Sequence, residues 1–183
     1  MRSSPEQEGE LAAARLALVE RLGPRITEAY RVLAEADTVV DTSYSSEWLT
    51  GEGDPSEDLA EALEASRGKE FERGSTLVGP QRDDLECSID GLAARTHASQ
   101  GEQRTLALAL RLGGHRLVAE DTDDDPVLLL DDVFSELDDH RSAALVAHLP
   151  AGQTIVTTAG RLPDGIVVER HVIAGEGRLE EVA

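Results

Sequence analysis

Two adjacent carboxylates, Asp131 and Asp132, directly follow the apolar run VLLL at residues 127–130. Because no polar residue alternates with the apolar ones, this run predicts a strand buried on both faces, as in a parallel sheet. In such sheets ligands bind at the carboxyl ends of the strands. One carboxylate there could bind Mg²⁺, and the second could orient or deprotonate a water that attacks a phosphate. The alternative is that both aspartates only cap the turn that follows.

A second motif, ASQGEQRTLALALRL at residues 98–112, opens a long predicted helix. Ser99 and Glu102 have the S-x-x-E spacing of a capping box, and capping alone would explain them. A helix start is also an anion site, because its backbone N–H groups lack partners and carry a partial positive charge. Gly101 would let a phosphate approach the backbone closely, and the Ser99 hydroxyl could donate a hydrogen bond to it. The motif therefore predicts either a cap or a phosphate contact.

The elements before these motifs predict a helical arm over residues 1–73. Ser4 and Gln7 have capping-box spacing at the start of the first helix, and Gly23 with Pro24 should interrupt that helix. A strand at 36–44 and a helix from Asp54 to about residue 72 should follow. The apolar stripe expected on the first helix consists of Leu11, Ala14, Leu18 and Leu22, continued after the interruption by Ile26, Tyr30 and Leu33.

Residues 74–183 should form an α/β domain, a mostly parallel sheet flanked by helices. Strands and helices alternate in this part of the sequence, and the pattern ends in a hairpin that turns at residues 175–177. The expected strands lie at 75–79, 85–91, 127–130 and 153–158, the expected helices at 101–119 and 139–149, and the hairpin strands at 165–173 and 178–182.

Composition limits the classes of function. The net charge of −20, from 37 acidic and 17 basic residues, argues against a free-standing nucleic-acid binder, since phosphate neutralisation needs clustered Lys and Arg. The single cysteine, Cys87, excludes a disulfide framework and fits a reducing cytoplasm. No apolar run approaches the roughly 20 residues of a membrane span. We therefore expect a cytoplasmic protein without a membrane anchor.

The order of the two motifs along the chain indicates a class of protein more specifically than either motif alone. SQGEQR, the apolar run with two aspartates, and then SELD follow one another as in ABC-type ATPases. Together with GPQRDDL at 79–85, PVLLLDDVFSELD at 126–138 and TIVTT at 154–158, they make the sequence closely resemble the C-terminal part of the RecF family, within the SMC-like group of ATPases. The resemblance implies the C-terminal half of an ABC/SMC-like ATPase head with a helical arm.

The resemblance also implies roles for particular residues. Ser99, Gln100, Gly101 and Glu102 match the ABC signature, which contacts the γ-phosphate of ATP held by a partner subunit. Asp131 matches the Walker B residue that acts on Mg²⁺.

Three further positions match parts of the catalytic machinery. Asp132 stands where relatives carry the catalytic glutamate, and Asp138 matches the D-loop aspartate that works across the dimer interface. Thr158 stands where many ABC ATPases have a switch histidine.

Several positions depart from the common pattern of ABC ATPases. Gln100 replaces the first glycine of the signature, Asp132 is one methylene shorter than glutamate, and Thr158 cannot act as an imidazole. These departures fit a slow, DNA-dependent ATPase. Gln81 replaces a histidine of the family motif, with no predicted consequence.

A P-loop is missing from the sequence. That motif, G-x-x-x-x-G-K-[ST], cradles the phosphates of ATP, whereas the one lysine here, Lys69, lies in SRGKEFE without the required glycines. We therefore expect the chain to be a fragment, the C-terminal half of a RecF-type protein, and to be inactive by itself.

The resemblance implies ATP and Mg²⁺ as cofactors and an ATP-dependent homodimer. It further implies binding of single-stranded or gapped DNA, partners of the RecR and RecO type, and roles in replication, recombinational repair and SOS induction. The basic surface for DNA would lie outside this sequence or in a local cluster that includes Arg104 and Arg111. The alternatives are another SMC-like or ABC ATPase head, and an inactive half-domain that acts only by docking on a protein.

Overall fold

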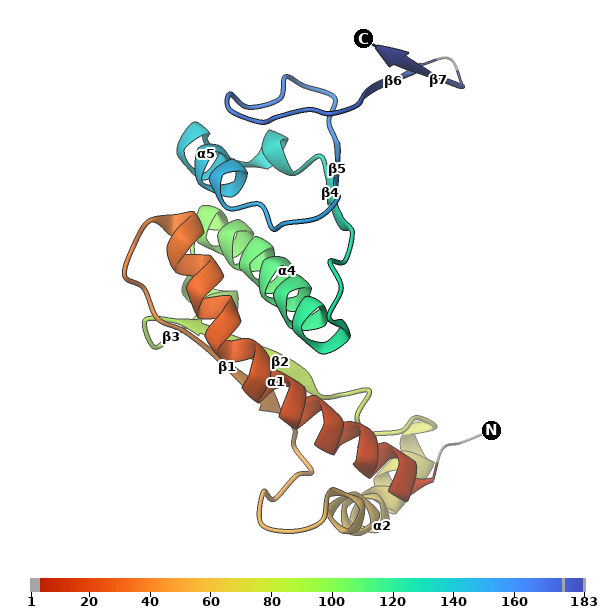
Figure 1. The fold of residues 1–183 in the computed structure, drawn as a ribbon. Coiled ribbons are helices and arrows are strands. Elements are labelled where there is room, and N and C mark those ends of the chain that lie inside the picture. Colours follow the sequence, from red (N-terminus) through yellow and green to blue (C-terminus); the bar gives the residue numbers. More distant parts are fainter. Residues whose placement is uncertain (1–3, 176, 183) are drawn as a thin grey trace. The chain divides into compact units, whose positions relative to one another are not determined.

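The computed structural model describes residues 4–175 and 177–182 and divides the chain into two compact units, Met1–Pro126 and Val127–Ala183 (Figure 1). None of the helices in these described ranges is long and apolar enough to cross a membrane. The boundary predicted at residues 73 and 74 separates an arm from an ATPase half and lies inside the first unit. It stays a prediction.

Helix α1 (Pro5–Ala34) is a single helix of 30 residues that starts with the predicted Ser4–Gln7 capping box. The predicted interruption at Gly23 and Pro24 is wrong, because Pro24 lies inside the helix. A proline in a helix interior removes one backbone hydrogen bond and costs about 3 kcal/mol. Packing of α1 against α2, α4 and β1 offsets this cost.

The buried face of α1 differs from the predicted stripe in the first half of the helix. Leu11 and Leu18 are each 45% exposed, whereas Gly9 and Ala12 are buried. The reason is close packing on α2 (Pro55–Arg73), where a Cβ on Gly9 would lie 2.6 Å from the Ser56 backbone. In the second half the predicted residues are confirmed as buried: Ile26, Tyr30 and Leu33.

Helix α1 also packs on α4 (Gln100–Thr122) (Figure 1). A Cβ on Gly113 of α4 would lie 3.2 Å from the Ile26 side chain, so the two backbones approach closely there. Two surface ion pairs, which we call the α1–α4 ion pairs, join the helices near the end of α4: Arg21 with Asp121, and Arg25 with Glu120. Each ion pair lowers the pKa of its carboxylate, chiefly through the hydrogen bond from the guanidinium.

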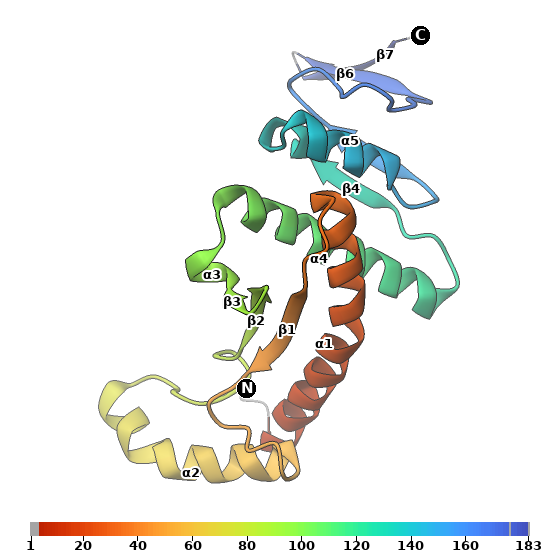
Figure 2. The ribbon, with the colours of Figure 1, turned by 90° about the vertical axis from the view of Figure 1, so that its left-hand side faces the viewer.

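A three-stranded antiparallel sheet, in the order β1-β2-β3, contacts α1 through β1 (Figure 2). Its strands are β1 (Val40–Ser45), β2 (Asp84–Ile89) and β3 (Leu92–Ala93), followed by the short helix α3 (Ala94–His97). The predicted Asp90–Gly91 turn joins β2 to β3 with positive φ at both residues, as a two-residue hairpin turn requires.

The strand predicted at residues 75–79 is not formed, because side chains take the backbone groups of this segment. The Glu70 carboxylate accepts the Leu77 N–H at 2.6 Å, and the Arg82 guanidinium donates to the Thr76 carbonyl at 2.8 Å. These bonds shape a bent segment that leads into β2.

The hydrophobic cluster next to this segment consists of Ala12, Trp48 and Leu59. Asp83 accepts hydrogen bonds from two aromatic side chains at this cluster. One carboxylate oxygen accepts the Trp48 indole N–H at 2.9 Å, and the other accepts the Tyr44 hydroxyl proton. Burial, together with the hydrogen bond to Asp83, raises the pKa of Tyr44.

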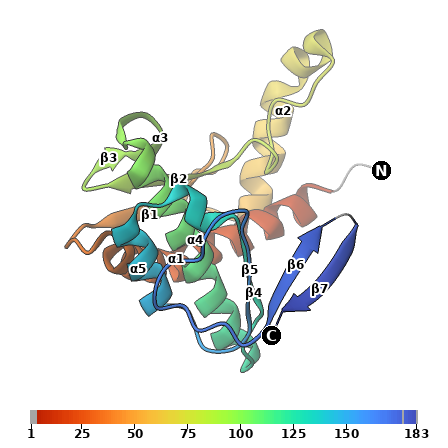
Figure 3. The ribbon, with the colours of Figure 1, turned by 90° about the horizontal axis from the view of Figure 1, so that it is seen from above.

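The described residues of the second unit form two separate strand pairs (Figure 3). Strands β4 (Leu128–Asp131) and β5 (Thr154–Thr157) are parallel. The antiparallel pair β6 (His171–Gly175) and β7 (Arg178–Val182) forms the predicted closing hairpin, with Glu176 outside the described residues. Its first strand begins at His171, and the predicted strand residues 165–170 are not in a strand. The 3₁₀ helix η1 (Val133–Glu136) and helix α5 (Asp139–Ala147) lie between β4 and β5 in sequence. Over the described part of the chain, parallel pairing is confined to β4 and β5.

Strand β4 is not buried on both faces as predicted. Leu128 and Leu130 are 6% and 5% exposed, but Leu129 is 69% exposed and Ile155 on β5 is 46% exposed. A two-stranded sheet presents two faces, and among the described residues only the face of Leu128 and Leu130 is covered. The uniform run of apolar residues therefore gave no sign of which face would be covered.

Candidate functional site

Asp131 and Asp132 lie at the carboxyl end of β4, where the sequence places them. Asp131 is the last residue of the strand and pairs with Thr157, the last residue of β5. The Thr157 hydroxyl donates a hydrogen bond to Asp131 Oδ1. The backbone N–H of Asp132 donates to the Thr157 carbonyl oxygen at 3.0 Å and lies 3.3 Å from the Thr157 hydroxyl oxygen. Thr157 thus contacts both aspartates, a position that sequence reasoning missed.

Asp132 has a left-handed backbone, with φ 48° and ψ 26°. Few non-glycine residues adopt this conformation, and aspartate is among those that tolerate it. The Ser135 hydroxyl lies 2.9 Å from Asp132 Oδ2 and 2.8 Å from the Asp132 carbonyl oxygen, and can donate to either. Although Asp132 precedes η1, its side chain caps no backbone N–H of that turn. Capping therefore does not explain the Asp132 carboxylate.

Both aspartates remain open to solvent, with one oxygen of each carboxylate bound to a hydroxyl. In the described ranges no group of three or more His, Cys, Asp or Glu side chains could hold a metal ion. Mg²⁺ nevertheless fits the pair, since it commonly binds one or two carboxylates together with waters and substrate phosphates. Asp131 would hold the ion, which when bound neutralises developing charge on a phosphate, and Asp132 would orient the attacking water.

Asp138 and Thr158 have other contacts in the structure. The Asp138 carboxylate caps α5, accepting the Arg141 backbone N–H at 2.8 Å and its guanidinium at 2.6 Å. The backbone hydrogen bond is the main reason that the pKa of Asp138 is lowered. The Thr158 hydroxyl accepts the Gly160 N–H at 3.0 Å, so the hydroxyl on Asp131 belongs to its neighbour Thr157. The D-loop and switch roles stay predictions.

The signature residues begin α4 in the first unit, and the predicted capping box is confirmed. Glu102 donates its N–H to the Ser99 hydroxyl, and its carboxylate accepts both the N–H and the hydroxyl of Ser99 at 2.7 Å. The first N–H groups of a helix have no partner within it. The capping box provides an acceptor for the backbone N–H of Glu102, and the backbone N–H groups of Gln100 and Gly101 are left to bind an anion. Capping and phosphate contact are therefore compatible.

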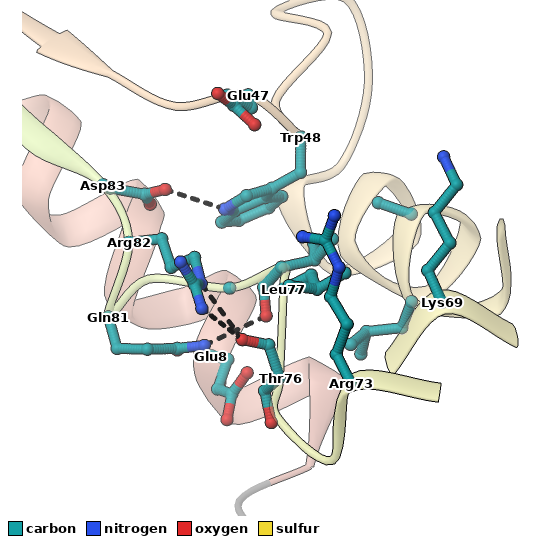
Figure 4. A pocket seen from close by; sticks show the side chains of 14 residues that line it. Glu8, Glu47, Trp48, Lys69, Arg73, Thr76, Leu77, Gln81, Arg82 and Asp83 are labelled. Atoms are coloured by element: carbon teal, nitrogen blue, oxygen red, sulfur yellow. Dashed lines mark hydrogen bonds between the residues drawn. The ribbon is translucent and has the colours of Figure 1, made fainter. Parts of the chain in front are cut away.

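A groove of about 1050 Å³ lies in the first unit between α2 and the bent segment before β2 (Figure 4). Lys69 and Arg73 of α2 line it, as does Trp48, whose ring donates to Asp83. Its three cationic side chains are matched by three carboxylates, those of Glu8, Glu47 and Asp83. A groove of balanced charge is poorly suited to a polyphosphate, and Lys69 does not replace a P-loop lysine.

Two curated relatives carry the name DNA replication and repair protein RecF. The one from Frankia alni (strain DSM 45986 / CECT 9034 / ACN14a) is 45% identical over 176 residues, which is 90% of this chain and 46% of the relative. This chain is similar to RecF over part of that protein's length. The RecF of Nocardioides sp. (strain ATCC BAA-499 / JS614) is 41% identical over 188 residues, covering 94% of this chain and 44% of the relative. The chain spans about half the length of the RecF proteins it matches.

Solved RecF structures extend the similarity to three dimensions. The recombination mediator protein RecF with ATP, from the RecFOR pathway, matches with a TM-score of 0.81 and 28% identity over 98% of this chain and 48% of that chain. The RecF-ATPrS structure matches with a TM-score of 0.83 over the same shares. These matches confirm the predicted fold class, part of an ABC/SMC-like ATPase of the RecF type. No family model matches the chain.

Proposed function

We propose that this chain supplies the signature, Walker B and D-loop parts of a RecF-type ATPase that acts in DNA replication, recombinational repair and SOS induction. The observation that carries the proposal is the 45% identity to the Frankia alni RecF over 176 residues. The similarity to RecF structures named for ATP and ATPrS supports ATP as the nucleotide. These matches are named RecF, and they therefore favour a RecF-type protein over the other reading from the sequence, a different SMC-like head.

Two groups of residues divide the chemistry in this proposal. At the end of β4, Asp131 holds Mg²⁺ and Asp132 orients or deprotonates the water that attacks the γ-phosphate. At the start of α4, the backbone N–H groups of Gln100 and Gly101 contact the γ-phosphate of ATP bound to a second subunit. The Ser99 hydroxyl joins them by turning its proton from the Glu102 carboxylate to the phosphate. Asp138 acts across the interface of the resulting homodimer, and Thr158 occupies the switch position.

Single-stranded or gapped DNA and proteins of the RecR and RecO type complete the proposed assembly, which would work in the cytoplasm. The name of the RecFOR pathway in a matching structure supports the protein partners. Arg104 and Arg111 are exposed on α4 and are the candidate DNA contacts within this chain. The net charge of −20 requires that such contacts be local, because a phosphate backbone would be repelled elsewhere.

The test is ATP hydrolysis by this chain joined to the part of the Frankia alni RecF that lies outside the match. We expect DNA-stimulated hydrolysis in the joined protein and at least a roughly 100-fold loss in its Asp132→Asn variant, the scale of a lost general base. Asp125→Asn, a change of equal charge in an exposed loop, is the matched control. No hydrolysis by the joined protein would reject the ATPase assignment and leave the docking half-domain as the better explanation.

A further inference from the structure

Two hydroxyl groups hold the pair of aspartates at the end of β4, and the proposed function assigns neither of them a role, although Ser135 begins the SELD motif that ends in Asp138. Thr157 contacts Asp131, and Ser135 contacts Asp132. We propose that Thr157 and Ser135 are positioning residues, which set the orientation of the two carboxylates for metal binding and for attack on the phosphate. This inference rests on the proposed function, because it assigns Asp131 and Asp132 the same roles.

The hydrogen-bond direction at Thr157 is fixed by its neighbours. A hydroxyl has one proton to donate, and the Asp131 carboxylate can only accept it. The lone pairs of the Thr157 oxygen then face the backbone N–H of Asp132, 3.3 Å away. A single hydroxyl thereby joins the side chain of one aspartate to the backbone of the next. It leaves Asp131 Oδ2 as the oxygen directed to a metal ion.

Ser135 acts on the second carboxylate across the turn that follows β4. Asp132 has a left-handed backbone, which sends its side chain out of the line of the strand. The Ser135 hydroxyl lies within 2.9 Å of both Asp132 Oδ2 and the Asp132 carbonyl oxygen, so the turn and the carboxylate are held together. Asp132 Oδ1 is then the oxygen left to meet a water.

Because this site is exposed, an effect of a hydroxyl on metal binding can be distinguished from an effect on protein stability. Asp131, Asp132, Ser135 and Thr157 are all exposed, so loss of either hydroxyl should change the melting temperature little. Side chains that orient a metal ligand, in contrast, commonly change metal affinity by about 10–100-fold when they are removed. A large effect on metal binding with an unchanged melting temperature is therefore the signature of positioning.

The first test uses Mn²⁺ as a paramagnetic probe on the isolated chain. We would follow the methyl resonances of Leu130 and Val156, which precede Asp131 and Thr157 on the paired strands. Wild type should show broadening that Asp131→Asn abolishes. Thr157→Val should need about tenfold more Mn²⁺ for equal broadening, at the lower end of the expected range. Thr157→Ser, which restores the hydroxyl, should behave as wild type.

Thr154→Val is the matched control, since Thr154 pairs with Leu128 at the opposite end of β5 from Thr157 and should not affect the probe. Equal Mn²⁺ titrations for Thr157→Val and wild type would overturn the assignment of Thr157. Absence of local broadening in wild type would overturn it as well, because Asp131 would then present no metal site. These outcomes do not depend on ATP hydrolysis, so they are distinct from failure of the proposed function.

The second test addresses Ser135 in the joined protein described above. Ser135→Ala should lower kcat about tenfold while KM for ATP stays within twofold, because Ser135 orients Asp132 and does not touch the nucleotide. Ser135→Thr should restore most of the rate. An unchanged kcat in Ser135→Ala would overturn the assignment of Ser135, while a joined wild-type protein without activity would reject the proposed function and the Ser135 role together.

Discussion

Asp83 should be essential for the stability of the first unit, because it is the acceptor for two aromatic side chains. Trp48 is 6% exposed and donates its indole N–H to one oxygen of Asp83, and Tyr44 donates to the other. A hydrogen bond to a charged group contributes roughly 1.5–3 kcal/mol. Two such bonds at the lower value predict that Asp83→Ala lowers the free energy of unfolding by about 3 kcal/mol.

Asp83→Asn distinguishes the hydrogen bonds from the charge. An asparagine carbonyl can accept from Trp48 while its amide donates to the Tyr44 hydroxyl, which can accept as well as donate. We therefore expect a smaller loss, about 1 kcal/mol. Asp84→Ala is the matched control, since the Asp84 carboxylate makes an exposed ion pair with Arg95 and accepts the neighbouring Leu85 N–H, and its loss should change stability by less than about 1 kcal/mol.

The assay is urea unfolding of each variant, followed by the fluorescence of the single tryptophan and by circular dichroism. A loss in Asp83→Ala no larger than in Asp84→Ala would refute the reasoning, because the buried donors would then be satisfied without Asp83. Tyr44 adds a pH dependence. Since its folded pKa is raised, its contribution is fully present below about pH 10, the ordinary value, and is lost as the pH rises further through the folded pKa.

Two further predictions concern the packing of α1. Gly9→Ala should lower the free energy of unfolding by about 1–3 kcal/mol, since its Cβ would lie 2.6 Å from the Ser56 backbone. Gly68→Ala, on the open side of α2, should instead raise the free energy of unfolding by about 0.5–1 kcal/mol. Thermal unfolding of both variants checks this, and a stabilised Gly9→Ala would contradict the close approach. The α1–α4 ion pairs hold the pKa of both carboxylates low, so their contribution is present above about pH 4 and is lost as the pH falls through the folded pKa values. Melting temperatures of wild type and Asp121→Asn should therefore differ at pH 7 in low salt and converge at pH 2 or in 1 M salt, and a difference that persists in both would show that Asp121 acts by other means.

The parts of the fold that sequence predicted well are those fixed by neighbouring residues. Both capping boxes and the Asp90–Gly91 turn depend on residues at most three positions apart, and all three formed. The failures depended on distant partners. Pro24 is tolerated in α1 because of packing that the local sequence does not contain, and the segment at 75–79 is bent by Glu70 and Arg82.

The candidate site shows the same limit. Asp131 and Asp132 were identifiable because a carboxylate pair after an apolar strand is a local pattern. Thr157 was not, because its contact with Asp131 depends on the register of two parallel strands 26 residues apart in sequence, and a shift by one residue would have put Thr158 there. Ser135, three residues after Asp132, carried a local signal for a turn contact that could have been read.

Helix α1 is a long helix that connects α2 with α4 in the first unit. By its rise per residue it is about 45 Å long, and it contacts α2 near one end and the signature-bearing helix α4 near the other. Pro24 is the natural point at which such a helix bends. Gly9 lies about 22 Å from Pro24 along the axis, so a bend of about 10° there would carry the α2 contact through roughly 4 Å. Such a bend would move α2 relative to α4, the helix that begins with the residues proposed to meet ATP.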